Sequence, residues 1–172
     1  MARATKQDAI KLLKQDHREV DGLFKEFEKL EKEGSGAVEQ VIATACTELK
    51  MHDRIEMEVF YPAVREAARE EEVEDLLNEA EVEHSTVRQL IQTIEGMSAD
   101  DEKRNAHFTV LAEYVKHHVK EEEREMFPKV KKLESLDLKA LGEQMQARKA
   151  ELLSEMGVDM EELESDPEDE IA

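Results

Sequence analysis

The residues best suited to chemistry are histidines and glutamates that recur at a fixed spacing. His52 and Glu56 are four residues apart, and so are His118 and Glu122. Residues four apart lie one turn above each other on the same face of a helix, so each pair presents an imidazole nitrogen and a carboxylate to one point. Groups of these two kinds that converge on one point are typical ligands of a transition-metal ion.

Two further histidines, His17 and His84, share the register of the apolar residues around them. We therefore expect their side chains to point into the core. A single buried histidine is more often a hydrogen-bonded core residue than a ligand. Four histidines and two glutamates at matched depth would leave several polar groups unsatisfied in a metal-free core, which favours metal ligation.

An internal repeat of a helical hairpin relates these residues to each other. At a separation of 67 residues, similar residues occupy corresponding positions: Ile10, Leu13, His17, Val20, Phe24 and Phe27 correspond to Leu77, Ala80, His84, Val87, Ile91 and Ile94. A displacement of 66 turns His52, Glu56, Phe60 and Pro62 into His118, Glu122, Met126 and Pro128. The polar residues repeat together with the core, so each hairpin is predicted to supply two histidines and one glutamate.

Helical periodicity predicts the elements that position these side chains. Apolar residues at spacings of three and four predict four helices, at about residues 6–31, 37–62, 77–96 and 108–128. Thr5 and Asp8 resemble a capping box at the first helix start. Pro62 is expected to kink or interrupt the second helix, and Pro128 to end the fourth. Short polar loops between four helices predict an all-α fold, an antiparallel up-down-up-down four-helix bundle with an additional C-terminal helix.

The domain prediction divides the chain into three parts. Residues 1–133 form the bundle, residues 134–157 form a C-terminal helix, and residues 158–172 form a disordered acidic tail. The C-terminal helix is expected either to pack on the bundle or to join two copies in a homodimer.

Composition excludes several classes of partner. The 172 residues suffice for one domain with a core, and their net charge of −20 argues against binding to nucleic acid or to anionic membranes. The single cysteine, Cys46, excludes an intrachain disulfide and a cysteine-based zinc cluster. No segment approaches the ~18 apolar residues of a membrane span, and no signal peptide is evident at the N-terminus. A cytoplasmic protein without a membrane partner is predicted.

Six converging ligands are too many for one tetrahedral zinc ion and suit two first-row ions that share carboxylates, with iron favoured. The predicted ligands are His17 and His52 for one ion, His84 and His118 for the other, and Glu56 and Glu122 as bridges. The cofactor is therefore expected to be two non-haem iron ions joined by an oxo or hydroxo bridge, with positions left for an exogenous ligand.

The full pattern of these ligands, with Phe-Tyr-Pro at 60–62 and Met-Phe-Pro at 126–128, resembles the haemerythrin-like HHE cation-binding domain over about residues 6–131. The resemblance implies a non-haem di-iron centre and a role in dioxygen binding, iron handling, sensing or peroxide chemistry. Respiratory haemerythrins have a further histidine one turn after the first in the third helix, and an aspartate in the fourth. Here those positions are Arg88 and Glu122.

Three functions remain open at this point. The first is a di-iron protein whose centre interacts with O₂ or reduced oxygen species. The second is an enzyme, a di-iron centre that decomposes peroxide in the manner of a catalase or peroxidase. The third is an iron-sensing or interaction module in which the metal is structural.

The neighbours of the predicted ligands are assigned other roles. Asp53, Glu121 and Glu123 are interpreted as solvated surface residues, and so is His117, which lies about 100° around the helix from its neighbouring ligand. Tyr61 has two equally supported interpretations, as a border of the metal pocket or as simple packing. No catalytic side chain is predicted.

Overall fold

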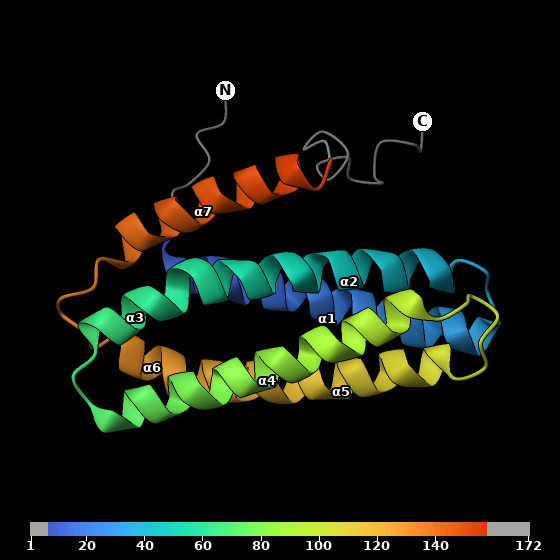
Figure 1. The fold of residues 1–172 in the computed structure, drawn as a ribbon, viewed down its shortest axis with the longest axis horizontal. Coiled ribbons are helices and arrows are strands. Elements are labelled where there is room, and N and C mark those ends of the chain that lie inside the picture. The colour runs from blue at the N-terminus through green and yellow to red at the C-terminus, as the bar shows by residue number, and fades with distance from the viewer. Residues whose placement is uncertain (1–6, 158–172) are drawn as a thin grey trace.

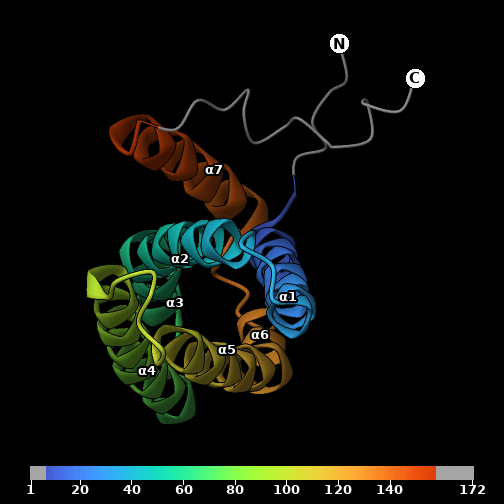
Figure 2. The same cartoon turned by 90° about the vertical axis from the view of Figure 1, so that its right-hand side faces the viewer.

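A computed structural model describes residues 7–157 of the chain. The four helices of its bundle are α1 (Ala9–Glu33), α2 (Val38–Ile55), α4 (Glu71–Gly96) and α5 (Arg104–Glu121). They run up and down in alternation (Figure 1) and close into a ring in the order α1, α2, α4, α5 (Figure 2). The all-α bundle is confirmed, and the described residues contain no strand and no helix long and apolar enough to cross a membrane.

The first helix begins at Ala9, where Asp8 is the N-cap. The Asp8 carboxylate accepts a hydrogen bond from the backbone N–H of Lys11 at 2.9 Å, which satisfies one of the free donors of the first turn. The predicted start near residue 6 was too early, and Thr5 lies outside the described residues. Gly34 ends α1 with φ 65°, a left-handed conformation that favours glycine.

Pro62 lies inside a continuing helix, so of the two expectations for it the interruption was wrong. The fourth helix ends at Val130, two residues after the predicted end at Pro128. α2 runs through a π-helical turn, η1 (Glu56–Phe60), into α3 (Tyr61–Ala67), and α5 runs through η2 (Glu122–Met126) into α6 (Phe127–Val130). In both turns the first residue accepts a hydrogen bond from the backbone N–H five positions on. This shift in register places Pro62 and Pro128 at the start of a new helix, where no N–H donor is needed. Both π turns begin at a predicted ligand, and such turns are frequent at functional sites.

The buried apolar residues form two clusters along the bundle axis. One cluster surrounds Leu13, Tyr61 and Leu77 near α3 and α6, and the other surrounds Phe24 and Phe108 near the opposite end. The polar residues of the bundle interior lie in a layer between them, because His17 follows Leu13 and precedes Phe24 on the inward face of α1.

The last described helix, α7 (Leu138–Glu155), packs outside the ring against α1 and α2 (Figure 2). It buries Leu141, Met145, Leu152 and Leu153. The Nε of Arg148 donates to Glu58 at 2.7 Å, and the Nζ of Lys149 donates to Asp16 at 3.0 Å. Packing on the bundle was one of the two expectations for this helix. The homodimer remains a prediction, and the predicted disordered tail, residues 158–172, lies outside the described residues.

Gly142 sits where α7 crosses the start of α1. A Cβ atom at this position would lie 2.5 Å from the carbonyl oxygen of Gln7 and 3.0 Å from the backbone nitrogen of Ala9. Because backbone atoms cannot move aside cheaply, we expect Gly142→Ala to lower the free energy of unfolding by about 1–3 kcal/mol, measured by denaturant titration. Gly22→Ala is the matched control in α1, with nothing within 4 Å of its new Cβ, and is expected to stabilise the chain. Equal responses of the two variants would contradict this account.

Candidate metal centre

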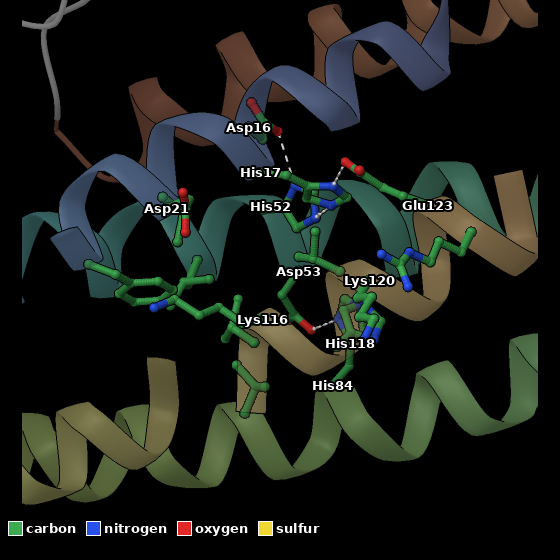
Figure 3. Close-up of a pocket in the computed structure, with 17 residues that line it drawn as sticks. Asp16, His17, Asp21, His52, Asp53, His84, Lys116, His118, Lys120 and Glu123 are labelled. Atoms are coloured by element: carbon green, nitrogen blue, oxygen red, sulfur yellow. Dashed lines mark hydrogen bonds and ion pairs between the residues drawn. The ribbon is translucent and has the colours of Figure 1, made fainter. Parts of the chain in front are cut away.

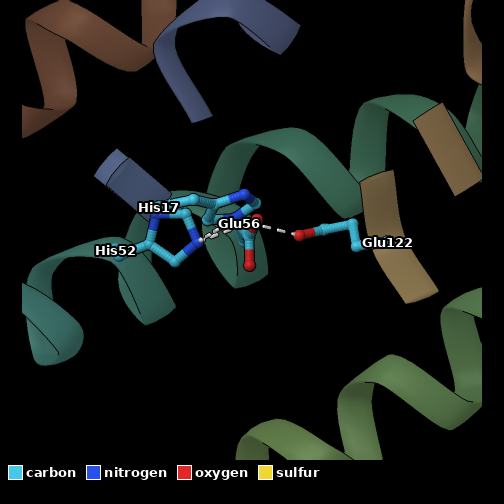
Figure 4. Close-up of side chains that lie close together, drawn as sticks. All are labelled: His17, His52, Glu56 and Glu122. Carbon is cyan, nitrogen blue, oxygen red and sulfur yellow. Dashed lines mark hydrogen bonds and ion pairs between the residues drawn. The ribbon is translucent and has the colours of Figure 1, made fainter. Parts of the chain in front are cut away.

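All six predicted ligands lie in the buried polar layer. Glu56 is 0% exposed and Glu122 is 2% exposed, and the histidines are buried as well. The histidines come one each from α1, α2, α4 and α5, and the two glutamates are the first residues of the π turns. Figure 4 shows His17, His52, Glu56 and Glu122 gathered around one point. The layer is therefore built by all four helices of the bundle.

The histidines form two pairs whose Nε2 atoms face each other. The Nε2 atoms of His17 and His52 are 3.2 Å apart, and those of His84 and His118 are also 3.2 Å apart. Two groups of ligand atoms result, each with all atoms within 4.8 Å of one another. The first contains His17, His52, Glu56 and Glu122, and the second contains Glu56, His84 and His118. Glu56 belongs to both groups, which is the geometry that a bridging carboxylate requires.

Two buried oxygens in this layer lack a hydrogen-bond partner among the described residues, Glu56 Oε1 and Glu122 Oε2. Glu56 Oε1 lies 3.1 Å from Nε2 of His52, and Glu122 Oε2 lies 3.3 Å from Nε2 of His17, but neither contact has hydrogen-bond geometry. Burying an unsatisfied carboxylate oxygen is costly. A metal cation among these oxygen and nitrogen atoms would satisfy them, and the mixed imidazole and carboxylate donor set fits a first-row transition metal.

Each of the four imidazoles contacts a carboxylate through Nδ1, the ring nitrogen that faces away from the polar layer. The Nδ1 atoms of His17, His52 and His84 lie 2.9, 3.1 and 2.8 Å from the carboxylates of Glu123, Asp16 and Asp53, and Nδ1 of His118 is hydrogen-bonded to Glu83. Figure 3 shows the first three contacts. A carboxylate at Nδ1 fixes the tautomer and the orientation of the ring, so that Nε2 is free to bind a metal in the polar layer.

These contacts also control the protonation of the metal-free layer. Burial alone would lower the pKa of His84, but hydrogen bonds to Asp53 and Glu56 raise that pKa to about 9. Burial likewise opposes protonation of His52, yet the charge of Glu56 and the hydrogen bond to Asp16 raise its pKa well above the usual value. Burial would raise the pKa of Glu56, but the positive charge of His52 beside it keeps that pKa well below the usual value. Without metal, positive charge on imidazoles balances the buried carboxylate.

The hydroxyl of Tyr61 reaches the middle of the layer. It lies 3.0 Å from Glu122 Oε1, 3.2 Å from Glu56 Oε2 and 3.0 Å from Nε2 of His84. Burial and the two carboxylates raise the pKa of the Tyr61 hydroxyl well above its usual value, so the proton stays in place to be donated. Of its two sequence interpretations, the structure therefore supports a place at the site.

We expect Tyr61→Phe to destabilise the metal-free protein by about 1–3 kcal/mol, because the substitution removes the hydroxyl donor from two buried carboxylates. Denaturant unfolding after exhaustive chelation measures this change. Tyr114→Phe is the control, since Tyr114 is partly buried in the distant apolar cluster. An unfolding free energy unchanged by Tyr61→Phe would mean that the hydroxyl contributes nothing to the layer.

Comparison with protein families decides what this bundle is. The family described as Hemerythrin HHE cation binding domain matches residues 8–130. The chain belongs to this family. The matched HHE domain ends with α6 at Val130, so α7 is an addition to it.

A solved structure resembles this HHE domain over most of its length. It is a Hemerythrin HHE cation binding domain-containing protein from Mycobacterium kansasii, with a TM-score of 0.71 and 25% sequence identity, and the match covers 87% of this chain and 89% of that chain. Comparison with curated proteins gave no significant match.

The outer carboxylates of the HHE domain are the residues that the sequence interpretation missed. Asp53 was assigned to the surface but is 8% exposed, and it accepts hydrogen bonds from His84 and, at 2.6 Å, from Nη1 of Arg88. Glu123 was also assigned to the surface. Its carboxylate, on η2, nevertheless contacts Nδ1 of His17 on α1. His117 is exposed, as expected.

The sequence contained a signal for two of the four carboxylates that contact the Nδ1 atoms of the histidines. Asp16 and Glu83 each precede the lone histidine of their hairpin and are related by the same displacement of 67 residues. Each serves the other histidine of its own hairpin, His52 or His118. Asp53 and Glu123 have no acidic repeat mate, and they act across the two hairpins, so no repeat could have identified them.

A cavity of about 300 Å³ reaches the polar layer of the HHE domain (Figure 3). All four histidines of the layer line it. Arg88 does not line the cavity; its guanidinium instead holds Asp53 behind His84. Both histidine pairs therefore share one route of access for a small molecule.

Proposed function

We propose that this HHE domain binds two non-haem iron ions and that the resulting centre reacts with O₂ or reduced oxygen species. The proposed ligands are His17 and His52 for one ion, His84 and His118 for the other, and Glu56 and Glu122 between them. The observation that carries the proposal is the pair of ligand groups that share Glu56, with two buried carboxylate oxygens left unsatisfied. When bound, iron would supply Lewis acidity and redox chemistry.

The chain's own residues have separate tasks in this proposal. Glu56 is the principal bridge, and Glu122 leans toward the first pair, since its Oε2 lies 3.3 Å from His17 Nε2 and 3.7 Å from His118 Nε2. The outer carboxylates orient the imidazole rings through Nδ1. The Tyr61 hydroxyl holds a proton beside both bridging carboxylates.

Peroxide decomposition is the second candidate function, and the cavity favours it over reversible O₂ storage. Each histidine pair supplies two imidazoles, and both pairs face the same cavity. Two molecules of hydrogen peroxide can then give two of water and one of O₂ without an external reductant. We therefore expect peroxide consumption rather than a stable oxygenated form.

The test begins with anaerobic reconstitution with Fe(II), removal of loose metal and elemental analysis, which should give two irons per chain. Stopped-flow mixing with O₂, and separately with hydrogen peroxide under an O₂ electrode, then distinguishes the functions. O₂ release from peroxide supports decomposition, whereas a long-lived adduct that loses O₂ under vacuum supports carriage. One iron per chain or none would refute the dinuclear proposal, and two irons that react with neither probe would favour a structural or sensing role.

A further inference from the structure

The cavity beside the polar layer is larger than O₂ or hydrogen peroxide requires. Its volume of about 300 Å³ falls at the lower end of the range for small-molecule pockets, ~300–1,000 Å³. At ~30 Å³ for each water-sized unit, it has room for roughly ten non-hydrogen atoms. The walls beyond the histidines are mainly apolar and include Val20, Phe24, Leu49, Val87, Val115 and Val119. The interior therefore suits an apolar organic group.

The exposed rim of the cavity is basic. Lys116, Lys120 and Arg124 line it from α5 and η2, spaced four residues apart. The Nζ of Lys116 lies 3.5 Å from Glu28 and 5.9 Å from the centre of the Phe24 ring. Within the part of the chain that the structure describes, neither Lys120 nor Arg124 has a carboxylate within 4.0 Å of its charged nitrogens. These two cations are available to a ligand, in a chain whose net charge is −20.

The acidic residues that line the same cavity are all engaged. Asp53 is held by Arg88 and His84, and Glu123 by His17. Asp16 contacts His52 and Lys149, and Asp21 pairs with Lys25 at 2.6 Å. The uncommitted charges on the cavity lining are therefore positive. An apolar interior with a cationic rim is complementary to an organic anion with an apolar tail.

We propose that this cavity binds a medium-chain monocarboxylate of about the size of octanoate, which has ten non-hydrogen atoms. The carboxylate binds at Lys120 and Arg124, and the tail lies in the apolar chamber that leads to the four histidines. Lys120 and Arg124 are not among the proposed metal ligands, so the anion-binding end of the site stands apart from the proposed iron chemistry, while the four histidines line the inner end of the same cavity. A ligand in this position covers the route to the polar layer.

The test is isothermal titration of the full-length protein with octanoate, both as purified and after chelation. We expect one molecule of octanoate to bind per chain in both states. We expect weaker binding of 1-octanol, which lacks the carboxylate, and of acetate, which lacks the apolar tail. The double variant Lys120→Gln/Arg124→Gln should bind octanoate at least about tenfold more weakly, because charge-assisted hydrogen bonds are lost. Lys29→Gln/Lys32→Gln changes the net charge equally at exposed positions of α1 outside the cavity and should leave binding unchanged.

A second variant tests the chamber itself. Val119→Phe should fill part of the cavity from its half-buried position and abolish octanoate binding, with helical content unchanged by circular dichroism. Three results would overturn the proposal. The first is no binding of octanoate by the wild-type chain, the second is equal loss in both double variants, and the third is binding that disappears on chelation, which would place the carboxylate on the metal. The first two results do not depend on how many irons the chain binds, so the two proposals can fail separately.

Discussion

Glu56→Ala is expected to abolish tight binding of both metal ions, whereas His84→Ala should weaken mainly one. Glu56 is the residue common to both ligand groups, and it is fully buried, so no solvent-exposed carboxylate can replace it. His84 contributes to the second group only. Reconstitution with Fe(II), desalting and elemental analysis would give roughly zero irons per chain for the first variant and about one for the second.

Two further variants keep this prediction testable. Glu56→Gln preserves the shape of the side chain but not its charge, so it separates metal loss from misfolding. His117→Ala removes an exposed histidine from the same helix as His118 and should retain both ions. Two tightly bound irons in Glu56→Ala, or in a folded Glu56→Gln variant, would show that Glu56 is not the bridge.

Removal of the metal is expected to lower the melting temperature, and the loss should grow as the pH rises from about 6.5 to 9. In the metal-free protein, the pKa of His84 is raised to about 9, and those of His17 and His52 are also raised. A group whose folded-state pKa is raised stabilises the fold fully below its unfolded pKa of about 6.5, and the contribution disappears as the pH rises through the folded value. For His84 alone this contribution is on the order of 3 kcal/mol.

Metal binding has the opposite pH dependence, because a ligating imidazole must be deprotonated at Nε2. The metal-bound protein should therefore keep its stability over the range in which the metal-free protein loses it. Thermal melts at pH 6.5, 7.5 and 9, with and without a chelator, measure the difference. Coincident melts, or a metal-free melting temperature that rises over this range, would argue against ligation by these buried histidines.

The helical period and the internal repeat were enough to identify the bundle and the six residues of its polar layer. His17 and His84 lie on the apolar faces of their helices. Within each His-Glu pair of spacing four, the two residues lie one helical turn apart on the same face. Helix geometry alone therefore predicts that all six side chains point inward. The same reasoning applied to Pro62 failed. A proline excludes an α-helical hydrogen bond, but the chain continues the helix through a π turn that begins at Glu56, which places Pro62 at the start of α3.

Only the tertiary structure decided what surrounds the layer. Asp53 follows His52 and points about 100° away from it around the helix, which reads as surface in the sequence, yet that direction faces His84 on α4. Glu123 reaches His17 in the same way from η2, and Tyr61 reaches three residues of the layer because the π turn rotates it inward. Periodicity determines which face of each helix is buried. The rotation and axial alignment of one helix against the next, which come from packing, determine which polar groups meet there.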